Sequence, residues 1–187
     1  MTIDDGQPHD PARMVPFDQD ESRCRLQALP LRAIAAFAAR WGLRMEGFFY
    51  RLSLRDQHAA IRLIQVVVIV ACGGLVTGRL EVTRLAFRFQ LIALRWYVPS
   101  AWHRARMQWA LIRNDATRFS VCLAAHADAV AYCNLAGAVA GLGHAALAIE
   151  DLVESADRND EFDESLASRK AELIASALAA ASTVAVY

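Results

Sequence analysis

The stretch IQVVVIVACGGLVTGRL, residues 64–80, decides the fold, because three different structures can be written with these letters. It fits a buried strand that leads into a phosphate-binding glycine turn, a membrane span, or the core helix of a bundle. The nucleotide interpretation requires a sheet, yet the sequence contains no second convincing strand. Its glycines are also spaced GGxxxG, which differs from the GxGxxG of dinucleotide-binding folds.

The length of residues 64–80 argues against a membrane span. The uncharged segment between Arg62 and Arg79 has 16 residues, about 24 Å as a helix, whereas the hydrocarbon core of a bilayer is ~30 Å thick. Residues 129–149 are a longer uncharged segment, but they are mostly Ala and Gly and include Asn134 and His144, so lipid transfer is weakly favourable. We therefore expect no membrane partner and predict that residues 64–80 contain a core helix, apolar on all sides because neighbours surround it.

The composition supports a helical protein of one domain. The chain has 187 residues, is 56% hydrophobic and has a mean hydropathy of +0.23. Ala and Leu dominate while Gly and Pro are sparse, which favours helices, and this length is enough to bury a core without disulfides. We predict an all-α single-domain bundle of six or seven helices over residues 21–187, preceded by a flexible acidic arm at residues 1–20.

Several helix boundaries can be placed from local signals. Pro30 suits the start of a helix, and apolar residues then recur at three- and four-residue intervals. Ser53 with Asp56 resembles a capping box, and Gly73 and Gly74 are the natural end of the helix that it begins. Further helices are predicted over residues 80–98, 101–113 and 165–184, the first of them ending at Pro99. Residues 117–156 are predicted to form either two helices divided near Gly141 and Gly143 or one bent helix.

The formal net charge of zero conceals a segregation along the chain. Residues 1–21 hold six acids against Arg13, residues 22–118 hold sixteen Arg against four acids, and residues 119–187 hold ten acids against three basic residues. An acidic, basic, acidic order favours binding between unlike surfaces.

The basic middle contains a candidate polyanion or partner site at Arg84, Arg88, Arg95, Arg104 and Arg106. No acid occurs between Arg84 and Arg113, and aromatic residues lie among the arginines, as nucleic-acid surfaces require. Because these aromatics, Trp102 and Trp109 among them, recur at helical spacing, we predict that most belong to the core.

The four cysteines, Cys24, Cys72, Cys122 and Cys133, lack the CxxC spacing of metal sites. Cys122, His126 and Cys133 share one helical face, but they are too far apart along the axis for one ion. We expect free buried thiols, no metal and no cofactor. The acidic N-terminus has neither the basic nor the apolar region of a signal peptide, which favours a reducing, cytoplasmic setting.

A candidate buried polar site consists of His126, Asp128 and Tyr132. Asp128 is alone in an uncharged segment, and a buried carboxylate requires a cationic partner. We expect Arg62 or Arg88 to pair with it.

The segment LPLRAIAAFAARWGLRM at residues 29–45, followed by HAAIRLIQ at 58–65 and a Cys-Gly near the helix end, resembles Ala- and Arg-rich helical proteins of planctomycete-type bacteria. The present chain departs from that group at residues 41–44, where Cys-Ala-Arg-Arg is typical. The resemblance covers about a fifth of the chain, and it implies a bacterial origin and an all-helical fold without any particular activity.

These observations favour a non-enzymatic assembly module that binds a second copy or a protein partner, through arginines of the helices that begin near residues 31 and 80. Three alternatives stay open: nucleic-acid or other polyanion binding through residues 79–113, a small helical membrane protein, and an enzyme or a ligand- or metal-binding site around His126, Asp128 and Tyr132.

Overall fold

Helix α5 is the element around which the other helices pack. The computed structural model describes residues 19–157 and 164–185, which form α1 (Gln19–Gln27), α2 (Leu31–Met45), the 3-10 helix η1 (Glu46–Arg51), α3 (Leu54–Ala71), α4 (Arg79–Ile112), α5 (Ala116–Asp157) and α6 (Glu164–Ala185). Helix α5 contacts α2, α3, α4 and α6. The predicted all-α fold is confirmed, and the described residues contain no strand.

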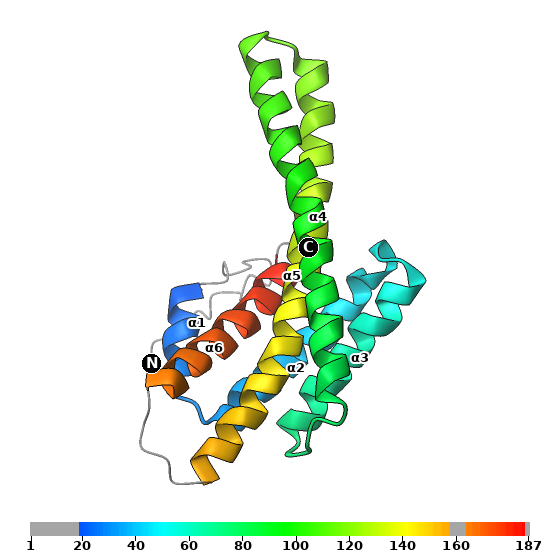
Figure 1. Ribbon diagram of the computed structural model, residues 1–187. Coiled ribbons are helices and arrows are strands. Elements are labelled where there is room, and N and C mark those ends of the chain that lie inside the picture. The colour runs from blue at the N-terminus through cyan, green and yellow to red at the C-terminus, as the bar shows by residue number, and fades with distance from the viewer. Residues whose placement is uncertain (1–18, 158–163, 186–187) are drawn as a thin grey trace, which may run out of the picture.

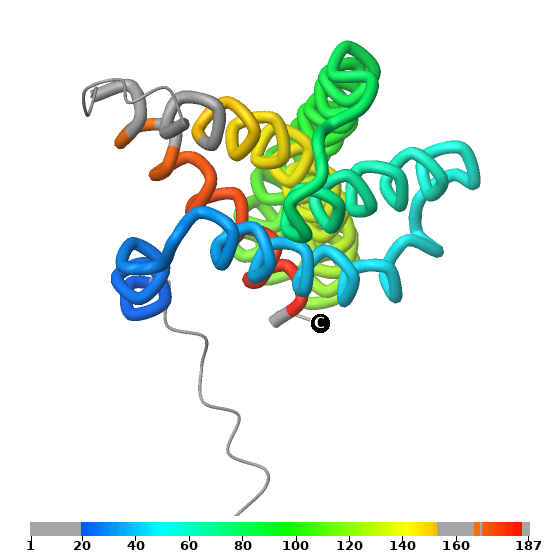
Figure 2. Tube along the Cα trace, turned by 90° about the horizontal axis from the view of Figure 1, so that it is seen from below, coloured from blue at the N-terminus to red at the C-terminus, as the bar shows by residue number. Residues whose placement is uncertain are grey.

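The core lies around the C-terminal half of α5. Leu135, Val139, Leu142 and Ile149 are fully buried there, together with residues of α2, α3 and α6. Figures 1 and 2 show α1 and α6 on one side of the molecule and α3 on the other. The flexible arm predicted for residues 1–20 falls almost wholly outside the described residues.

Helix α3 confirms the interpretation of the deciding stretch and corrects one detail. Its N-terminus is capped by Ser53, whose side chain accepts a hydrogen bond from the Asp56 backbone N–H, and its end is followed by Gly73 with a φ of 85°. Leu63 and Val67 are fully buried, but Gln65 is exposed. The helix is therefore amphipathic, since α2 and α5 cover only one of its sides.

The predicted break at Pro99 is wrong, and of the two alternatives for residues 117–156 the structure has the single helix. Helix α4 continues through Pro99, and α5 continues through Gly141 and Gly143. Proline removes one backbone donor and glycine lowers helix propensity by about 1 kcal/mol. Because α4 and α5 pack against each other, contacts on both sides of these residues hold the helices intact.

The C-terminal half of α4 and the N-terminal half of α5 project beyond the other helices as a two-helix arm (Figure 1). Asn114 forms its turn with a φ of 53°, a left-handed conformation that asparagine tolerates, and Asp115 accepts a hydrogen bond from the Arg118 backbone N–H at 2.9 Å. Two helices bury only the faces that they turn toward each other, so the arm leaves most of its side chains exposed.

Candidate docking surface on helix α4

Helix α4 has two apolar faces, of which the fold covers one. The inner face buries Val82, Ala86 and Phe89 in the core. On the opposite side, the apolar residues stay exposed. A helix with two apolar faces either lies wholly inside a protein or buries its second face against another molecule.

The second face forms a continuous stripe, which we call the outer stripe. The a and d positions of a heptad repeat, at alternating intervals of four and three from residue 80 to residue 112, fall on this face, and all of them are apolar except Arg84 and Gln108. The outer stripe consists of Leu80, Phe87, Leu91, Leu94, Val98, Ala101, Ala105 and Ile112, all exposed. Its large members expose from 51% (Leu91) to 77% (Ile112) of their surface. The stripe extends for about 48 Å at 1.5 Å per residue.

Trp102 and Trp109 flank the outer stripe, contrary to their predicted place in the core. They are 63% and 62% exposed, and Phe87 is 57% exposed. A fully exposed aromatic side chain offers about 150–250 Å², so these three alone expose roughly 300–450 Å², which already matches the largest apolar patch on a typical monomer. Sequence spacing identified the helix, but it could not tell which of the two apolar faces packs inside the chain.

Arginines accompany the outer stripe, and one of them, Arg84, occupies a heptad position between Leu80 and Phe87. Arg84, Arg95, Arg104 and Arg106 are exposed, and none of them pairs with a carboxylate among the described residues. Arg88 differs from them, because it is half-buried and pairs with Asp56 of α3. The arginine docking face stays a prediction, and on α4 the exposed arginines accompany an exposed apolar stripe.

The candidate buried polar site is not formed. Asp128 is exposed, and its expected partners are engaged elsewhere, since Arg62 pairs with Glu81 and Arg88 with Asp56. Asp128 stands instead at the rim of a shallow cavity of about 340 Å³ with Arg51 and Asn134.

His126 and Tyr132 each contact α4 separately. The His126 Nδ1 lies 2.9 Å from the backbone oxygen of Ser100, and because a carbonyl only accepts, this nitrogen donates. The Tyr132 ring stacks on Trp96 with 4.5 Å between ring centroids. Both side chains therefore hold α5 against α4.

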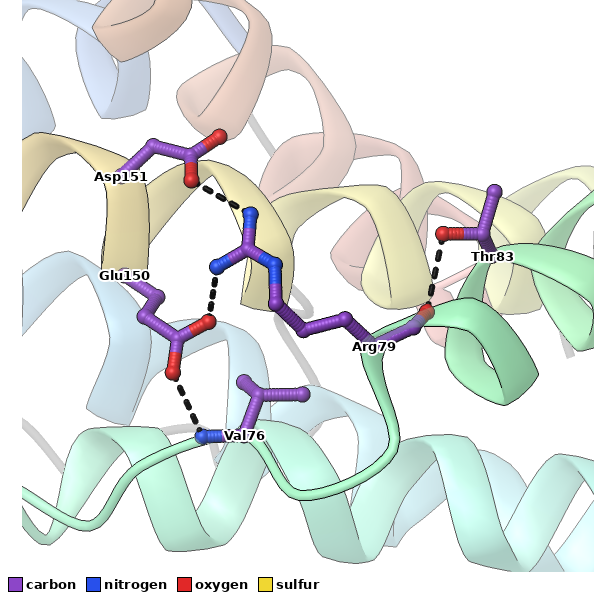
Figure 3. Close-up of polar contacts among 5 residues, drawn as sticks. All are labelled: Val76, Arg79, Thr83, Glu150 and Asp151. Carbon is purple, nitrogen blue, oxygen red and sulfur yellow. Dashed lines mark hydrogen bonds and ion pairs between the residues drawn. The ribbon is translucent and has the colours of Figure 1, made fainter.

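A group of polar contacts, which we call the ion-pair latch, joins the start of α4 and the loop before it to α5 (Figure 3). The Arg79 guanidinium binds the carboxylates of Glu150 and Asp151, and Glu150 also accepts a hydrogen bond from the Val76 backbone N–H at 2.8 Å. Thr83 donates to the Arg79 backbone oxygen at 2.9 Å. The sequence signal for this latch was the pair of acids at the end of an otherwise apolar helix.

The latch keeps Arg79 charged. The hydrogen bond to Asp151 is the main cause that raises the pKa of Arg79 above its ordinary value, while partial burial opposes it. A cation with a raised pKa contributes stability that is complete below the ordinary arginine pKa and is lost only at higher, strongly alkaline pH. Arg79 therefore stays charged, and able to bind both carboxylates, at every pH below the strongly alkaline range.

Removing one carboxylate tests the latch. Glu150→Ala breaks the bonds to both Arg79 and Val76, and because the Glu150 side chain is only 13% exposed, we expect unfolding free energy to fall by about 2–3 kcal/mol. Glu81→Ala is the matched control, since Glu81 forms an exposed pair with Arg62 and is expected to cost less than about 1 kcal/mol. Urea unfolding measures both changes, and equal losses would contradict a specific role for Glu150.

The cysteines differ from the prediction in part. Cys24 and Cys72 are exposed, whereas Cys122 is buried and Cys133 is half-buried. Burial raises the pKa of the Cys133 thiol. Among the described residues, no three His, Cys, Asp or Glu side chains come together as metal ligands.

One described helical segment, Ala116–Leu152, has the length and composition to cross a membrane, and 56% of its most apolar window is buried inside the fold. A core helix has the same properties, so this segment is weak evidence for a membrane. No family model, curated protein or solved structure matches the chain.

Proposed function

We propose that this protein is a non-enzymatic assembly module that associates with a second copy of itself through the outer stripe of α4. The observation that carries the proposal is the exposed heptad-spaced stripe on a helix whose other face is already packed. Heptad spacing suits another helix, which inserts its side chains between those of the first.

The size of the stripe agrees with a stable dimer. A standard interface buries about 800 Å² on each partner. The three aromatics supply roughly half of that area, and the seven remaining apolar residues of the stripe extend it along the helix. Burying this apolar surface stabilises the dimer by about 25 cal/mol per Å². The free energy cost of association has to be subtracted from this gain.

Polyanion binding is the second candidate, and a specific observation favours it. Arg84, Arg95, Arg104 and Arg106, which are exposed and have no carboxylate partner within residues 19–157 and 164–185, provide positive charge along one helix. A phosphate backbone, however, gains nothing from Leu91, which lies among them. Self-association explains the apolar residues between the arginines. A cytoplasmic setting remains a prediction.

A charge placed within the stripe tests self-association. We expect the wild-type chain to sediment as a dimer and Leu94→Glu to weaken dimerisation at least about 100-fold, because a carboxylate buried in an apolar interface costs several kcal/mol. Leu43→Glu, on α2, is the matched control, since Leu43 is 50% exposed and lies off the stripe. We expect it to dimerise like the wild type.

Salt separates the two candidates. Between about 0.1 M and about 1 M salt, the Debye length falls from ~10 Å to ~3 Å. An apolar dimer with arginines at its edges is expected to hold or tighten over this range, whereas polyanion binding weakens steeply. A wild-type chain that stays monomeric at 100 µM, or dimers of Leu94→Glu as stable as those of Leu43→Glu, would refute the assembly function.

A further inference from the structure

We infer that the two copies pair antiparallel along the full length of the outer stripe, about a two-fold axis beside Trp96. This inference rests on the proposed self-association and adds the orientation and register of the partner. It follows from the order of large and small residues along α4.

The stripe is complementary to itself when it is reversed. In an antiparallel pair of helices, each a position packs against a d position of the partner. Full overlap of residues 80–112 satisfies this rule at every layer. The layers then pair Leu80 with Ile112, Arg84 with Gln108, Phe87 with Ala105, Leu91 with Ala101, and Leu94 with Val98, the second residue of each pair belonging to the second copy.

Side-chain volume favours this register. Phe87, the largest stripe residue, faces Ala105, and Leu91 faces Ala101, so each large side chain fills the space that a small one leaves. A parallel, in-register pair places Phe87 against Phe87 and Ala105 against Ala105. Such layers alternate between overpacking and cavities, and both destabilise an interface.

Charge favours the same orientation. Arg84 occupies an a position and is exposed. A parallel pair would bring the two copies of Arg84 together inside the seam, whereas the antiparallel pair places Arg84 beside the neutral Gln108. Near the two-fold axis, Arg95 is the one bordering arginine of α4 that lies close to its own copy.

The small residues also favour a protein partner over a lipid surface. Ala101 and Ala105 are exposed in the middle of the stripe, where a closely packed helix requires short side chains opposite large ones. A bilayer interface adapts to any side-chain size and gains more from larger apolar residues. An anionic lipid surface is therefore the occupant that the test must exclude.

Disulfide trapping tests the orientation in the full chain. The exposed native thiols are first removed by Cys24→Ser and Cys72→Ser, and Leu80→Cys and Ile112→Cys are then introduced in separate chains. Bridged cysteines have Cα atoms about 4.4–6.8 Å apart. In the antiparallel pair, residue 80 of one copy lies beside residue 112 of the other, while like positions are roughly 48 Å apart.

We expect mild oxidation of the mixed chains to give a disulfide-linked dimer, and neither chain alone to do so. The antiparallel register is overturned if Ile112→Cys alone forms a disulfide-linked dimer. It is also overturned if the mixed chains sediment as a dimer but form no disulfide, and in both cases self-association stands. A wild-type monomer that binds vesicles of anionic phospholipid overturns both. Arg95→Gln separates these cases further, because it relieves repulsion in the dimer but weakens binding to anionic lipid.

Discussion

Replacing Phe89 by alanine is expected to lower the unfolding free energy by about 3–5 kcal/mol, the range for truncating a buried aromatic residue. Phe89 has no exposed surface and belongs to the hydrophobic core. Part of this loss is the apolar transfer free energy of the removed ring, and part is the cost of the cavity that it leaves. The cavity stays open because helices α4 and α5 are held apart by contacts along their length. Denaturant unfolding monitored by circular dichroism measures the change.

Phe87→Ala is the matched control, two residues away on the same helix. Phe87 belongs to the outer stripe and is 57% exposed. Its truncation is expected to change the unfolding free energy of the monomer by less than about 0.5 kcal/mol, while it weakens dimerisation. If the two variants lost equal stability in dilute solution, the assignment of inner and outer faces of α4 would be wrong.

The parts of the fold that sequence predicted are those set by local chemistry. Ser53 caps α3 because its side chain reaches a free backbone donor one turn away, and Gly73 ends the helix because it adopts a positive φ. Both effects depend on a few neighbouring residues. The apolar period of α2 likewise requires only the sequence of that helix.

Whether the helices continue through Pro99 and Gly141 could not be decided from sequence, because the outcome depends on distant packing. Proline and glycine weaken a helix by amounts that tertiary contacts exceed. In α4 and α5 those contacts come from each other along most of their length.

The outer stripe and the tryptophans beside it show that sequence also could not predict which apolar face of a helix is covered. The period of Trp102 and Trp109 predicts an apolar face but does not say whether this chain covers it. The structure shows that it does not, since both residues lie on the outside of the projecting arm. For Asp128 the error is the opposite one. Its apolar neighbours in the sequence suggested a buried side chain, but in the structure it is exposed.

Gly143→Val is expected to destabilise the fold by about 2–4 kcal/mol through overpacking. A Cβ on Gly143 would lie 2.9 Å from the Ala86 Cβ and 3.1 Å from the Leu63 Cδ2. Both of those residues are fully buried. The Ala86 Cβ cannot turn aside because it is fixed to the backbone of α4, so α5 has to move away from α4 and opens the core. Thermal unfolding and urea unfolding measure the loss.

Gly137 supplies the control within the same helix. The nearest atom to a Cβ there is the Ala93 Cβ at 4.0 Å, which is ordinary contact. Gly137→Ala is therefore expected to raise the unfolding free energy by about 0.5–1 kcal/mol, the gain in helix propensity over glycine. Gly143→Ala receives the same gain but has to separate two helices, and the clash is expected to exceed it. If Gly137→Ala raises the unfolding free energy and Gly143→Ala lowers it, Gly143 is the point where α5 crosses α3 and α4. Changes of the same sign would contradict this close approach.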